Sequence, residues 1–365
     1  MRLTLIIHSL DSGGAERVMS ILANYWAAKE WQITLLTFVD KTKVPFYHLD
    51  SRINYVPLNI ERRSPNAVVA IGNNYQYIYK LRKAIIDSKP EVIISFLTIN
   101  NVITLLATRG LSIPVIVSER TDPNKFPESK IWMNLRSLTY QFADAIAVQT
   151  TRAFNYFRPQ LQSKMVVVPN PVIIQNYNSD NSQKTLERPS IIAMGRLEFQ
   201  KGFDLLLEAF ALLKDTCPEW SLTVLGEGTL RSELESQRER LKLSDRVHFP
   251  GRVNNPAEIL KQADIFVMSS RYEGFPNALC EAMACGLPVI STDCPSGPQE
   301  IIRDGKDGIL VANENVAALK DAMKTLMLDD TKRQELGKKA LEITSRFSLI
   351  TITELWEKII SEVKN

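Results

Sequence analysis

Residues 269–285 read SSRYEGFPNALCEAMAC and decide how this chain is organised. The apolar run DIFVM at 264–268, just before this stretch, predicts a buried strand. Pro276 suits the first position of a helix, and the residues ALCEAMA at 278–284 are good helix formers. The stretch therefore predicts a strand, a tight loop and the start of a helix.

Two carboxylates frame this loop. Glu273 lies on the loop, and Glu281 lies about one turn into the helix. The N–H groups of residues 277–279 would be free at the helix start, where an anion binds well. A phosphate cradle between two carboxylates suits a sugar nucleotide, with one acid near the sugar and the other near the ribose. A capping carboxylate beside an ordinary buried acid explains the spacing equally well.

Length and composition indicate a globular protein with two domains. The chain has 365 residues, of which 45% are hydrophobic and 23% charged. The first apolar run, at residues 3–7, is too short for a signal peptide, and no run reaches the roughly 18 residues of a membrane span. We expect a cytoplasmic protein.

The cysteines and histidines give no sign of a metal site. The cysteines at 217, 280, 285 and 294 form no C-x-x-C pair, and the histidines at 8, 48 and 248 are far apart. We expect reduced thiols and no catalytic metal.

Charge is distributed unevenly along the chain. Residues 1–172 contain 20 Lys and Arg against 12 Asp and Glu, whereas the remainder has 24 against 29. A basic first half suggests an anionic partner such as a phospholipid surface or a pyrophosphate-bearing acceptor, although a harmless surface bias would look the same. No feature indicates nucleic-acid binding.

Short apolar runs alternate with helical patterns throughout, which predicts α/β units with parallel sheets. The expected strands lie at 2–8, 32–39, 53–57, 92–97, 114–118, 144–149, 165–168, 190–194, 221–225, 246–250, 264–268, 288–292 and 309–311. The polar stretch QNYNSDNSQKTLERP at 175–189 is the clearest linker. We therefore expect a first domain at 1–174 with a returning helix at 349–365, and a second domain at 175–348.

Several strand ends in the first domain carry candidate ligand loops. Gly13 and Gly14 between a strand and a helix allow close approach of the backbone to a ligand, but they do not complete the dinucleotide fingerprint. Glu119 and Arg120 follow the strand at 114–118, where a polar acceptor would bind. A helix at 65–88 carries a basic cluster that could lie on an anionic membrane, although such helices more often pack on their own domain.

The second domain has a more strongly charged loop. Gly195 and Arg196 follow the strand at 190–194, and Lys201 stands just before a helix. Arg offers a planar fork and Lys a point charge, which together suit a diphosphate. Gly251, Arg252 and Val253 end another strand.

Four motifs in this order, at Gly13–Glu16, Gly195–Gly202, Gly251–Val253 and Glu273–Glu281, resemble the retaining glycosyltransferases of family 4 over essentially the whole chain. The resemblance implies the GT-B fold: two Rossmann-like, doubly wound α/β domains that face a central cleft, with the last helix crossing back to the first domain. The loop at 9–17, the basic helix and residues 94–97 are similar to bacterial N-acetylgalactosaminyltransferases that extend lipid-pyrophosphate-linked oligosaccharides.

The resemblance also implies roles for single residues. Arg196 and Lys201 would hold the donor diphosphate, and Glu273 would contact the donor sugar, so these three would be catalytic. The remaining donor-binding positions would be Gly14, Gly195, Arg252, Val253, Gly274, Phe275, Asn277, Ala278, Leu279 and Glu281. The acceptor side would include Gly13, Glu119 and Arg120.

The implied reaction moves a hexose or N-acetylhexosamine from a nucleotide diphosphate sugar, typically UDP-linked, to a glycan or a polyprenyl-pyrophosphate-linked sugar. Family 4 needs neither a metal nor another cofactor, since Arg and Lys neutralise the departing diphosphate. Such an enzyme would be a peripheral membrane protein that assembles cell-surface polysaccharide or glycoprotein glycans. Many members carry a histidine near the donor sugar, where this chain has Arg120.

Other functions remain open from the sequence. A sugar-nucleotide epimerase on the same fold would need acid and base groups near the sugar carbon, and the chain has few histidines. A non-catalytic nucleotide-sugar-binding protein would bind the donor without turnover. Paired carboxylates could also mark a hydrolase, but both acids here lie among phosphate-binding elements.

Overall fold

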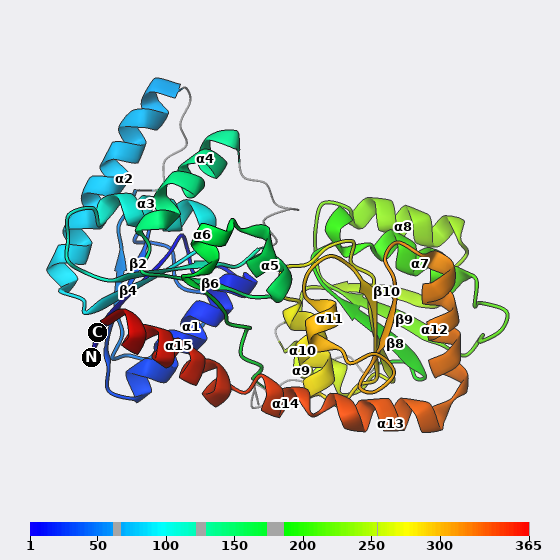
Figure 1. Ribbon diagram of the computed structural model, residues 1–365. Helices are drawn as coiled ribbons and strands as arrows, with labels where there is room; N and C mark the ends of the chain where they lie inside the picture. The colour runs from blue at the N-terminus through cyan, green and yellow to red at the C-terminus, as the bar shows by residue number, and fades with distance from the viewer. Residues whose placement is uncertain (61–66, 122–128, 174–185, 254, 365) are drawn as a thin grey trace. The chain divides into compact units, whose positions relative to one another are not determined.

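The chain folds into two compact units, each built on a parallel β-sheet. The structure, a computed structural model, describes residues 1–60, 67–121, 129–173, 186–253 and 255–364, with the backbone alone at 67–75. Unit 1 comprises Met1–Asn170 and Ile352–Asn365, and unit 2 comprises Pro171–Thr351. Unit 1 thus contains both terminal segments of the chain, which are blue and red in Figure 1. The boundary predicted at 174/175 lies at residues outside the described ranges.

The sheet of unit 1 is parallel, and its first strand lies inside it. Among the described residues it has seven strands in the order β3-β2-β1-β4-β5-β6-β7. These strands are β1 (Arg2–Ile7), β2 (Gln32–Thr37), β3 (Asn54–Pro57), β4 (Val92–Phe96), β5 (Val115–Glu119), β6 (Ala145–Val148) and β7 (Met165–Val167). The strand order reverses between β1 and β4, and ligands of open α/β sheets bind at the carboxyl ends of strands at such a reversal.

Helices cover both faces of this sheet. They are α1 (Gly14–Ala28), α2 (Ala67–Ser88), α3 (Thr98–Ala107), α4 (Lys130–Thr139), η1 (Tyr140–Phe142), α5 (Thr151–Tyr156), α6 (Pro159–Gln162) and α15 (Leu349–Lys364). Figure 1 shows α2 and α3 on one face and α1 with α15 on the other.

The last helix returns to unit 1, as the sequence predicts. Trp356 of α15 is fully buried, and its ring lies 5.8 Å from the ring of Phe96 at the end of β4. Lys29, the C-cap residue of α1, donates to Glu357 at 2.8 Å, which adds a surface ion pair to this contact. Buried aromatic area is the larger contribution, since exposed ion pairs add little.

The sheet of unit 2 repeats the same plan. Its described strands follow the order β10-β9-β8-β11-β12-β13, and every pairing is parallel. They are β8 (Ser190–Met194), β9 (Ser221–Leu225), β10 (Val247–Gly251), β11 (Ile265–Met268), β12 (Val289–Asp293) and β13 (Ile309–Ala312). The order reverses between β8 and β11, so a ligand is expected at the carboxyl ends of these two strands.

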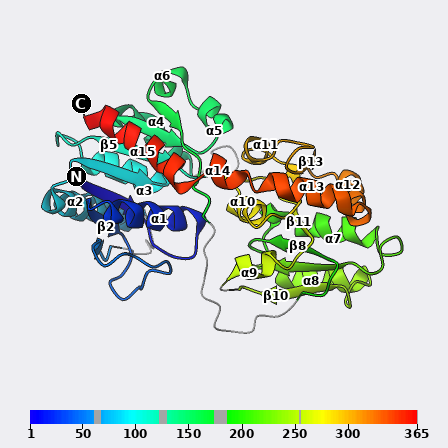
Figure 2. The same ribbon diagram turned by 90° about the horizontal axis from the view of Figure 1, so that it is seen from below.

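Helices again lie on both faces. They are η2 (Phe199–Lys201), α7 (Phe203–Ala211), α8 (Arg231–Arg240), α9 (Pro256–Leu260), α10 (Asn277–Ala284), α11 (Pro298–Ile301), α12 (Val316–Leu328), α13 (Asp330–Ala340) and α14 (Ile343–Arg346). One core packs α7 and α12 against the sheet, and the other packs α9 and α10 against its opposite face. Figure 2 shows this unit from below.

The predicted α/β class with two parallel, doubly wound sheets is confirmed. The strands are recognisable in the sequence because both faces of a parallel sheet are covered, which makes each strand a nearly continuous apolar run. Several strand ends differ by one or two residues from the predictions; β5, for example, continues to Glu119. Helix α10 begins at Asn277 rather than at Pro276. In the described part of the chain, no helix combines the length and the apolar character that crossing a bilayer requires.

Candidate active site

The candidate site of unit 2 lies where its strand order reverses. β8 ends at Met194 and β11 at Met268, and the two strands are neighbours in the sheet. The loops that follow them therefore leave the sheet side by side. One begins with Gly195 and leads to Lys201, and the other begins with Ser269 and leads to Glu273. The fold thus brings together the two charged motifs that the sequence singles out.

Lys201 and Glu273 form a close ion pair. The Nζ atom of Lys201 lies 2.6 Å from Oε1 of Glu273, and the two side chains are 16% and 6% exposed. The hydroxyl of Ser270 donates to the same carboxylate oxygen at 2.6 Å. The lysine is predicted to bind a diphosphate and the acid a sugar, and the contact between Lys201 and Glu273 means that the two bound groups would be adjacent.

Backbone contacts tie the two loops together around this pair. The side-chain amide of Gln200 donates to the carbonyl of Tyr272 at 2.9 Å, and the carbonyl of Gln200 accepts from the N–H of Arg271 at 2.8 Å. The hydroxyl of Ser269 donates to the carbonyl of Lys201 at 3.0 Å. The lysine is therefore held at its main chain as well as at its side chain.

Arg271 is a buried arginine whose side chain links the two loops, and no sequence pattern identified it. Its guanidinium donates to both oxygens of Asp204 at 2.8 and 2.6 Å and to the carbonyl of Phe199 at 2.8 Å. The guanidinium also lies 4.0 Å from the Phe199 ring centroid. The hydrogen bond to Asp204 is the main reason why the pKa of Arg271 is raised. Its partners are far away in the chain, so no local pattern points to the role.

Gly202 permits the close approach of these two loops. Its φ is +60°, and a Cβ atom placed on it would lie closer than 3.0 Å to the carbonyl oxygen of Ser269. A side chain is excluded both by the left-handed backbone and by a main-chain atom that cannot rotate away. Gly202 is thus required for the position of Lys201 immediately before it.

We expect Gly202→Ala to destabilise unit 2 and to remove the binding contribution of Lys201. The matched control is Gly305→Ala, because Gly305 has a similar φ of +70° with nothing within 4 Å of the added Cβ. The control should cost only about 1 kcal/mol for the left-handed backbone, and Gly202→Ala should cost distinctly more. Thermal unfolding and nucleotide affinity of both variants check this; equal losses in the two would refute the close-approach argument.

Three glycine-bearing loops adjoin one another beside the pair. Gly226, with a φ of +143°, has no room for a side chain next to the carbonyl of Gly195, and its N–H donates to the carbonyl of Gly251 at 2.9 Å. Arg196 follows Gly195 directly. It is exposed, and within the described residues its side chain makes no hydrogen bond or ion pair. The side chain of Arg196 is therefore available to an incoming anion.

The predicted base contacts lie at the end of β10. Arg252 is exposed and Val253 is half-buried, directly after Gly251. Their backbone follows the strand that flanks β9, next to the loop at Gly226. Their contact with a nucleotide base stays a prediction.

The start of α10 differs in detail from the prediction. Pro276 is the N-cap, and the N–H of Leu279 already donates to the Pro276 carbonyl at 3.1 Å, so this N–H is not free for an anion. The side chain of Phe275 is buried and meets the ring of Phe347 edge-on at 5.7 Å. Only the backbone of Phe275 is therefore available to a ligand. The remaining predicted positions, Gly274, Asn277, Ala278 and Glu281, are half-buried on this loop and helix.

The thiols near the site are poor nucleophiles. Cys294 and Cys280 are buried, and burial raises the pKa of both thiols, with a smaller contribution from Glu273 for Cys294 and from Glu281 for Cys280. Burial also raises the pKa of Cys285 to about 11. Because the thiolate is the reactive form, these cysteines are unsuited to covalent catalysis at neutral pH.

The residues predicted in unit 1 lie at two strand ends. Gly13 is the N-cap of α1, and its carbonyl accepts from the hydroxyl of Tyr47 at 3.2 Å. Gly14 is the first residue of the helix and is exposed. Both stand at the carboxyl side of β1, beside the reversal of the strand order. Their approach to a ligand stays a prediction.

The loop position predicted for Glu119 is wrong. Glu119 is the last residue of β5, and its carboxylate is 1% exposed. One oxygen accepts from Thr98 at 2.9 Å, and the other accepts from the hydroxyl of Tyr140 and lies 3.9 Å from Arg136. These contacts tie β5 to α3 and α4 and occupy the carboxylate inside the unit. Arg120 follows it and is also buried.

The basic cluster of α2 is partly used inside unit 1. Arg82 donates to the carbonyls of Ala107 and Arg109 at 2.7 and 2.8 Å, where α3 ends. Lys83, Tyr79 and Ile86 are exposed on the same helix. The predicted membrane-facing role of this helix therefore rests on fewer cations than the sequence suggests. Residues 65–66 of the predicted helix lie outside the described residues.

This arrangement is suited to stabilising a leaving diphosphate. Arg196 and Lys201 stand on the same loop, and Lys201 is largely shielded from water, which strengthens its interaction with a developing negative charge. Among the described residues, no group of three or more His, Cys, Asp and Glu side chains could hold a metal ion.

Comparison with known proteins covers both units. The family model Glycosyltransferase Family 4 matches residues 12–176, and the model Glycosyl transferases group 1 matches residues 175–342. The chain is 31% identical, over 100% of its length and 99% of the relative, to a GalNAc-α-(1→4)-GalNAc-α-(1→3)-diNAcBac-PP-undecaprenol α-1,4-N-acetyl-D-galactosaminyltransferase of Campylobacter jejuni. A second Campylobacter jejuni protein, an N-acetylgalactosamine-N,N'-diacetylbacillosaminyl-diphospho-undecaprenol 4-α-N-acetylgalactosaminyltransferase, is 29% identical over 96% of this chain and 97% of its own.

Solved structures agree on the fold. Sucrose-phosphate synthase from Thermosynechococcus elongatus has a TM-score of 0.83 at 18% identity and covers 99% of this chain and 98% of its own. Anabaena HepE in complex with UDP and glucose has a TM-score of 0.80 at 18% identity, with 99% of both chains covered. At these identities the similarity supports the GT-B fold but gives no information on the substrate.

Proposed function

The chain belongs to the glycosyltransferases of family 4, and from this premise we propose that it moves a hexose or N-acetylhexosamine, with retention of configuration, from a UDP-sugar to a polyprenyl-pyrophosphate-linked glycan. The observation that carries the proposal is the convergence of Arg196, Lys201 and Glu273 at the strand reversal of unit 2. The full-length similarity to two transferases named for diphospho-undecaprenol-linked acceptors supports the choice of acceptor.

The residues of unit 2 divide the work on the donor. Arg196 and Lys201 neutralise the diphosphate as the bond to the sugar breaks, since fixed cations stabilise the charge that develops in the transition state. Glu273 accepts hydrogen bonds from sugar hydroxyls while it keeps Lys201 in place. Glu281 binds the ribose hydroxyls, and the backbone of Arg252 and Val253 meets the base.

The acceptor side is proposed to lie in unit 1, with Gly13 and Gly14 next to the reacting groups. A lipid-linked acceptor would bring the protein to the cytoplasmic face of a membrane as a peripheral protein. The net positive charge of residues 1–172 supports attraction to anionic lipid. None of the relatives named above is an epimerase, so nothing favours that alternative.

The test is direct transfer to a synthetic polyprenyl-pyrophosphate glycan, with UDP- and GDP-linked sugars offered in turn. We expect one UDP-sugar to give an α-linked product, identified by the anomeric coupling in proton NMR. Activity should persist in EDTA, because the cations of the protein replace a metal at the diphosphate.

Two variants connect the activity to the site. Arg196→Ala should lower kcat/KM for the donor by about 10²-fold, whereas Arg240→Ala, an exposed arginine in the last turn of α8, should leave it unchanged. Release of free sugar with no glycan product, or loss of activity in EDTA that magnesium restores, would contradict the proposal.

A further inference from the structure

Arg120 is a buried cation at the carboxyl edge of the sheet of unit 1. It directly follows β5 and is 6% exposed. The carbon at the centre of its guanidinium lies 4.2 Å from the centroid of the Phe96 ring and 6.0 Å from the centroid of Trp356. Phe96 ends β4, and Trp356 comes from the returning helix α15. The guanidinium therefore lies against an aromatic pair built from two elements far apart in the chain.

In the described part of the chain, the nitrogens of this guanidinium have no acceptor. Among the described residues, nothing accepts a hydrogen bond from Nε, Nη1 or Nη2 of Arg120, or from the indole Nε1 of Trp356. A cation–π contact offsets only part of the cost of removing a guanidinium from water. These two neighbouring residues thus contribute several buried N–H donors to which the described chain offers no acceptor.

Arg136 shows how the same unit treats another buried arginine. It is 5% exposed and also lies against aromatic rings, those of Tyr156 and Phe157. Unlike Arg120, it donates to a hydroxyl, that of Tyr156 at 3.0 Å, and it lies 3.9 Å from the carboxylate of Glu119. The nearest acid to Arg120 in the sequence is therefore committed elsewhere. Unit 1 therefore provides partners for one buried arginine, Arg136, while none of its described residues provides an acceptor for Arg120.

The backbone is strained directly after the neighbouring strand, β4. Leu97, which follows Phe96, has φ +77° and ψ 140°, a conformation that side-chain-bearing residues rarely adopt. Its N–H donates to the carbonyl of Ser118 at 3.0 Å, which fixes it to β5 just before Arg120. Strain of this kind gathers at ligand sites, and ligands of such sheets bind at the carboxyl ends of strands.

We propose that Arg120 and the indole N–H of Trp356 form an anion subsite of unit 1 that takes phosphate oxygens of a pyrophosphate group. The identity of the anion rests on the proposed function, which supplies two sources of the same chemistry: the UDP of the donor and the pyrophosphate of the lipid-linked acceptor. A guanidinium matches phosphate geometry with two parallel hydrogen bonds. Burial lowers the pKa of Arg120 to about 9, so the group is still a cation at neutral pH.

The test measures stability and binding in Arg120→Met, Arg120→Lys and the control Arg136→Met. Methionine keeps an apolar stem on the aromatic pair and removes the unmatched charge. Arg120→Met should therefore keep or raise the Tm while weakening anion binding at least about tenfold. The anion affinity of Arg120→Lys should fall between that of Arg120→Met and that of the wild type. Arg136→Met should lower the Tm, because it leaves Glu119 without its cation, and should not change anion affinity.

Calorimetry with UDP and with geranyl pyrophosphate distinguishes the two sources. Weaker binding of UDP alone assigns the subsite to the donor, and weaker binding of geranyl pyrophosphate alone assigns it to the acceptor. Unchanged affinity for both probes overturns the proposal, as does a fall in Tm of Arg120→Met with binding intact, which would make Arg120 a structural cation. Sugar transfer by the wild type is scored separately, so a failed transfer assay and a failed subsite are told apart.

Discussion

Lys201→Met should lower kcat/KM for the nucleotide sugar by about 10²–10³-fold, the loss typical when one transition-state charge stabiliser is removed. The lysine is 16% exposed and lies 2.6 Å from Glu273, so it acts where water screens it weakly. Most of the loss should appear in kcat, because the diphosphate gains negative charge as it departs.

The same variant should also destabilise unit 2, since it leaves the buried carboxylate of Glu273 with hydroxyl and amide donors alone. Removing one partner of a buried ion pair typically costs about 3–5 kcal/mol, and the partial exposure of Lys201 places the expected value at or below the lower end. The double variant Lys201→Met/Glu273→Gln separates the two effects. It should recover stability, because no unpaired charge remains, and it should stay inactive.

Steady-state kinetics and urea unfolding of these variants give the answer. Recovery of activity in the double variant would contradict the role of Lys201 on the diphosphate. Equal activity of Lys201→Met and wild type would contradict the account of the whole site. Lys201→Arg is a further comparison: it keeps the charge but replaces a point charge by a planar fork, so partial activity is expected.

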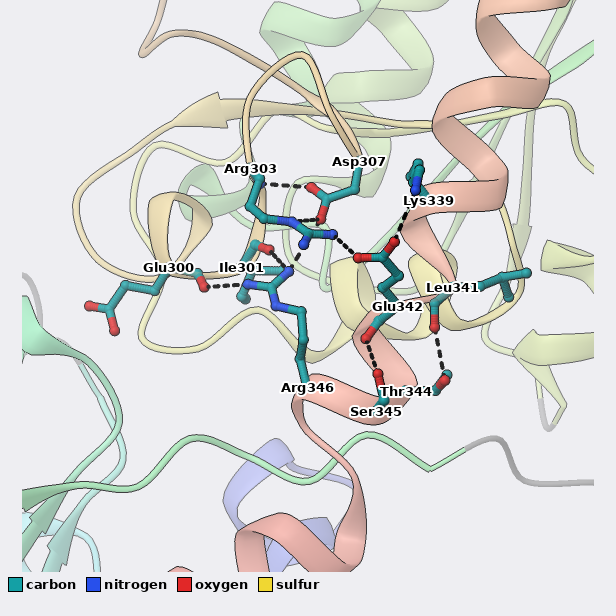
Figure 3. Close-up of polar contacts among 10 residues, drawn as sticks. All are labelled: Glu300, Ile301, Arg303, Asp307, Lys339, Leu341, Glu342, Thr344, Ser345 and Arg346. Atoms are coloured by element: carbon teal, nitrogen blue, oxygen red, sulfur yellow. Dashed lines mark hydrogen bonds and ion pairs between the residues drawn. The ribbon is translucent and has the colours of Figure 1, made fainter.

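Asp307→Ala should be among the most destabilising single substitutions outside the candidate site, at about 3–5 kcal/mol. Asp307 is fully buried and accepts from the backbone N–H of Arg303 at 2.7 Å and from its Nε at 2.6 Å. Arg346 donates to the same carboxylate at 3.2 Å. Figure 3 shows the two guanidinium groups close to each other beside the carboxylate. Its removal would leave two cations close together without their shared counter-charge.

This network also fixes the end of α14, close to the point where the chain passes to unit 1. Arg346 donates to the carbonyls of Ile301 and Glu300 at 2.8 and 3.2 Å, and the carbonyl of the next residue, Phe347, accepts from Val172 at 2.8 Å. The chain therefore leaves unit 2 beside the segment by which it enters. Loss of Asp307 should loosen both segments.

Urea unfolding and limited proteolysis test this prediction. Glu342→Ala is the graded comparison, because Glu342 pairs with Arg303 at 2.7 Å but is 39% exposed and should contribute much less. Asp321→Ala, at an exposed ion pair of α12, should change nothing measurable. A loss in Asp307→Ala no larger than that in Glu342→Ala would refute the argument from burial.

The fold could be predicted from the sequence because both sheets are parallel and covered on both faces. Runs such as LII at 5–7 and IFVM at 265–268 are therefore apolar throughout and easy to recognise. Glu119 shows where this reasoning fails. A carboxylate after an apolar run looks like the first residue of a loop, and its partners Thr98, Tyr140 and Arg136 cannot be inferred from local pattern.

The candidate site was predictable in its composition but not in its contacts. Motif order predicts that Arg196, Lys201 and Glu273 are functional residues, and the strand reversal explains why they lie close together. The direct contact of Lys201 with Glu273 joins residues 72 positions apart, and the ion pair of Arg271 joins residues 67 apart. Such pairs depend on tertiary packing, which neither spacing nor propensity encodes.

The central claim is that cations of unit 2 hold the diphosphate of the donor, and a crystal structure with UDP bound tests it most directly. We expect phosphate oxygens at about 2.7–2.9 Å from Nζ of Lys201 and from the guanidinium of Arg196, with the ribose beside Glu281. A nucleotide whose phosphates contact neither cation would contradict it.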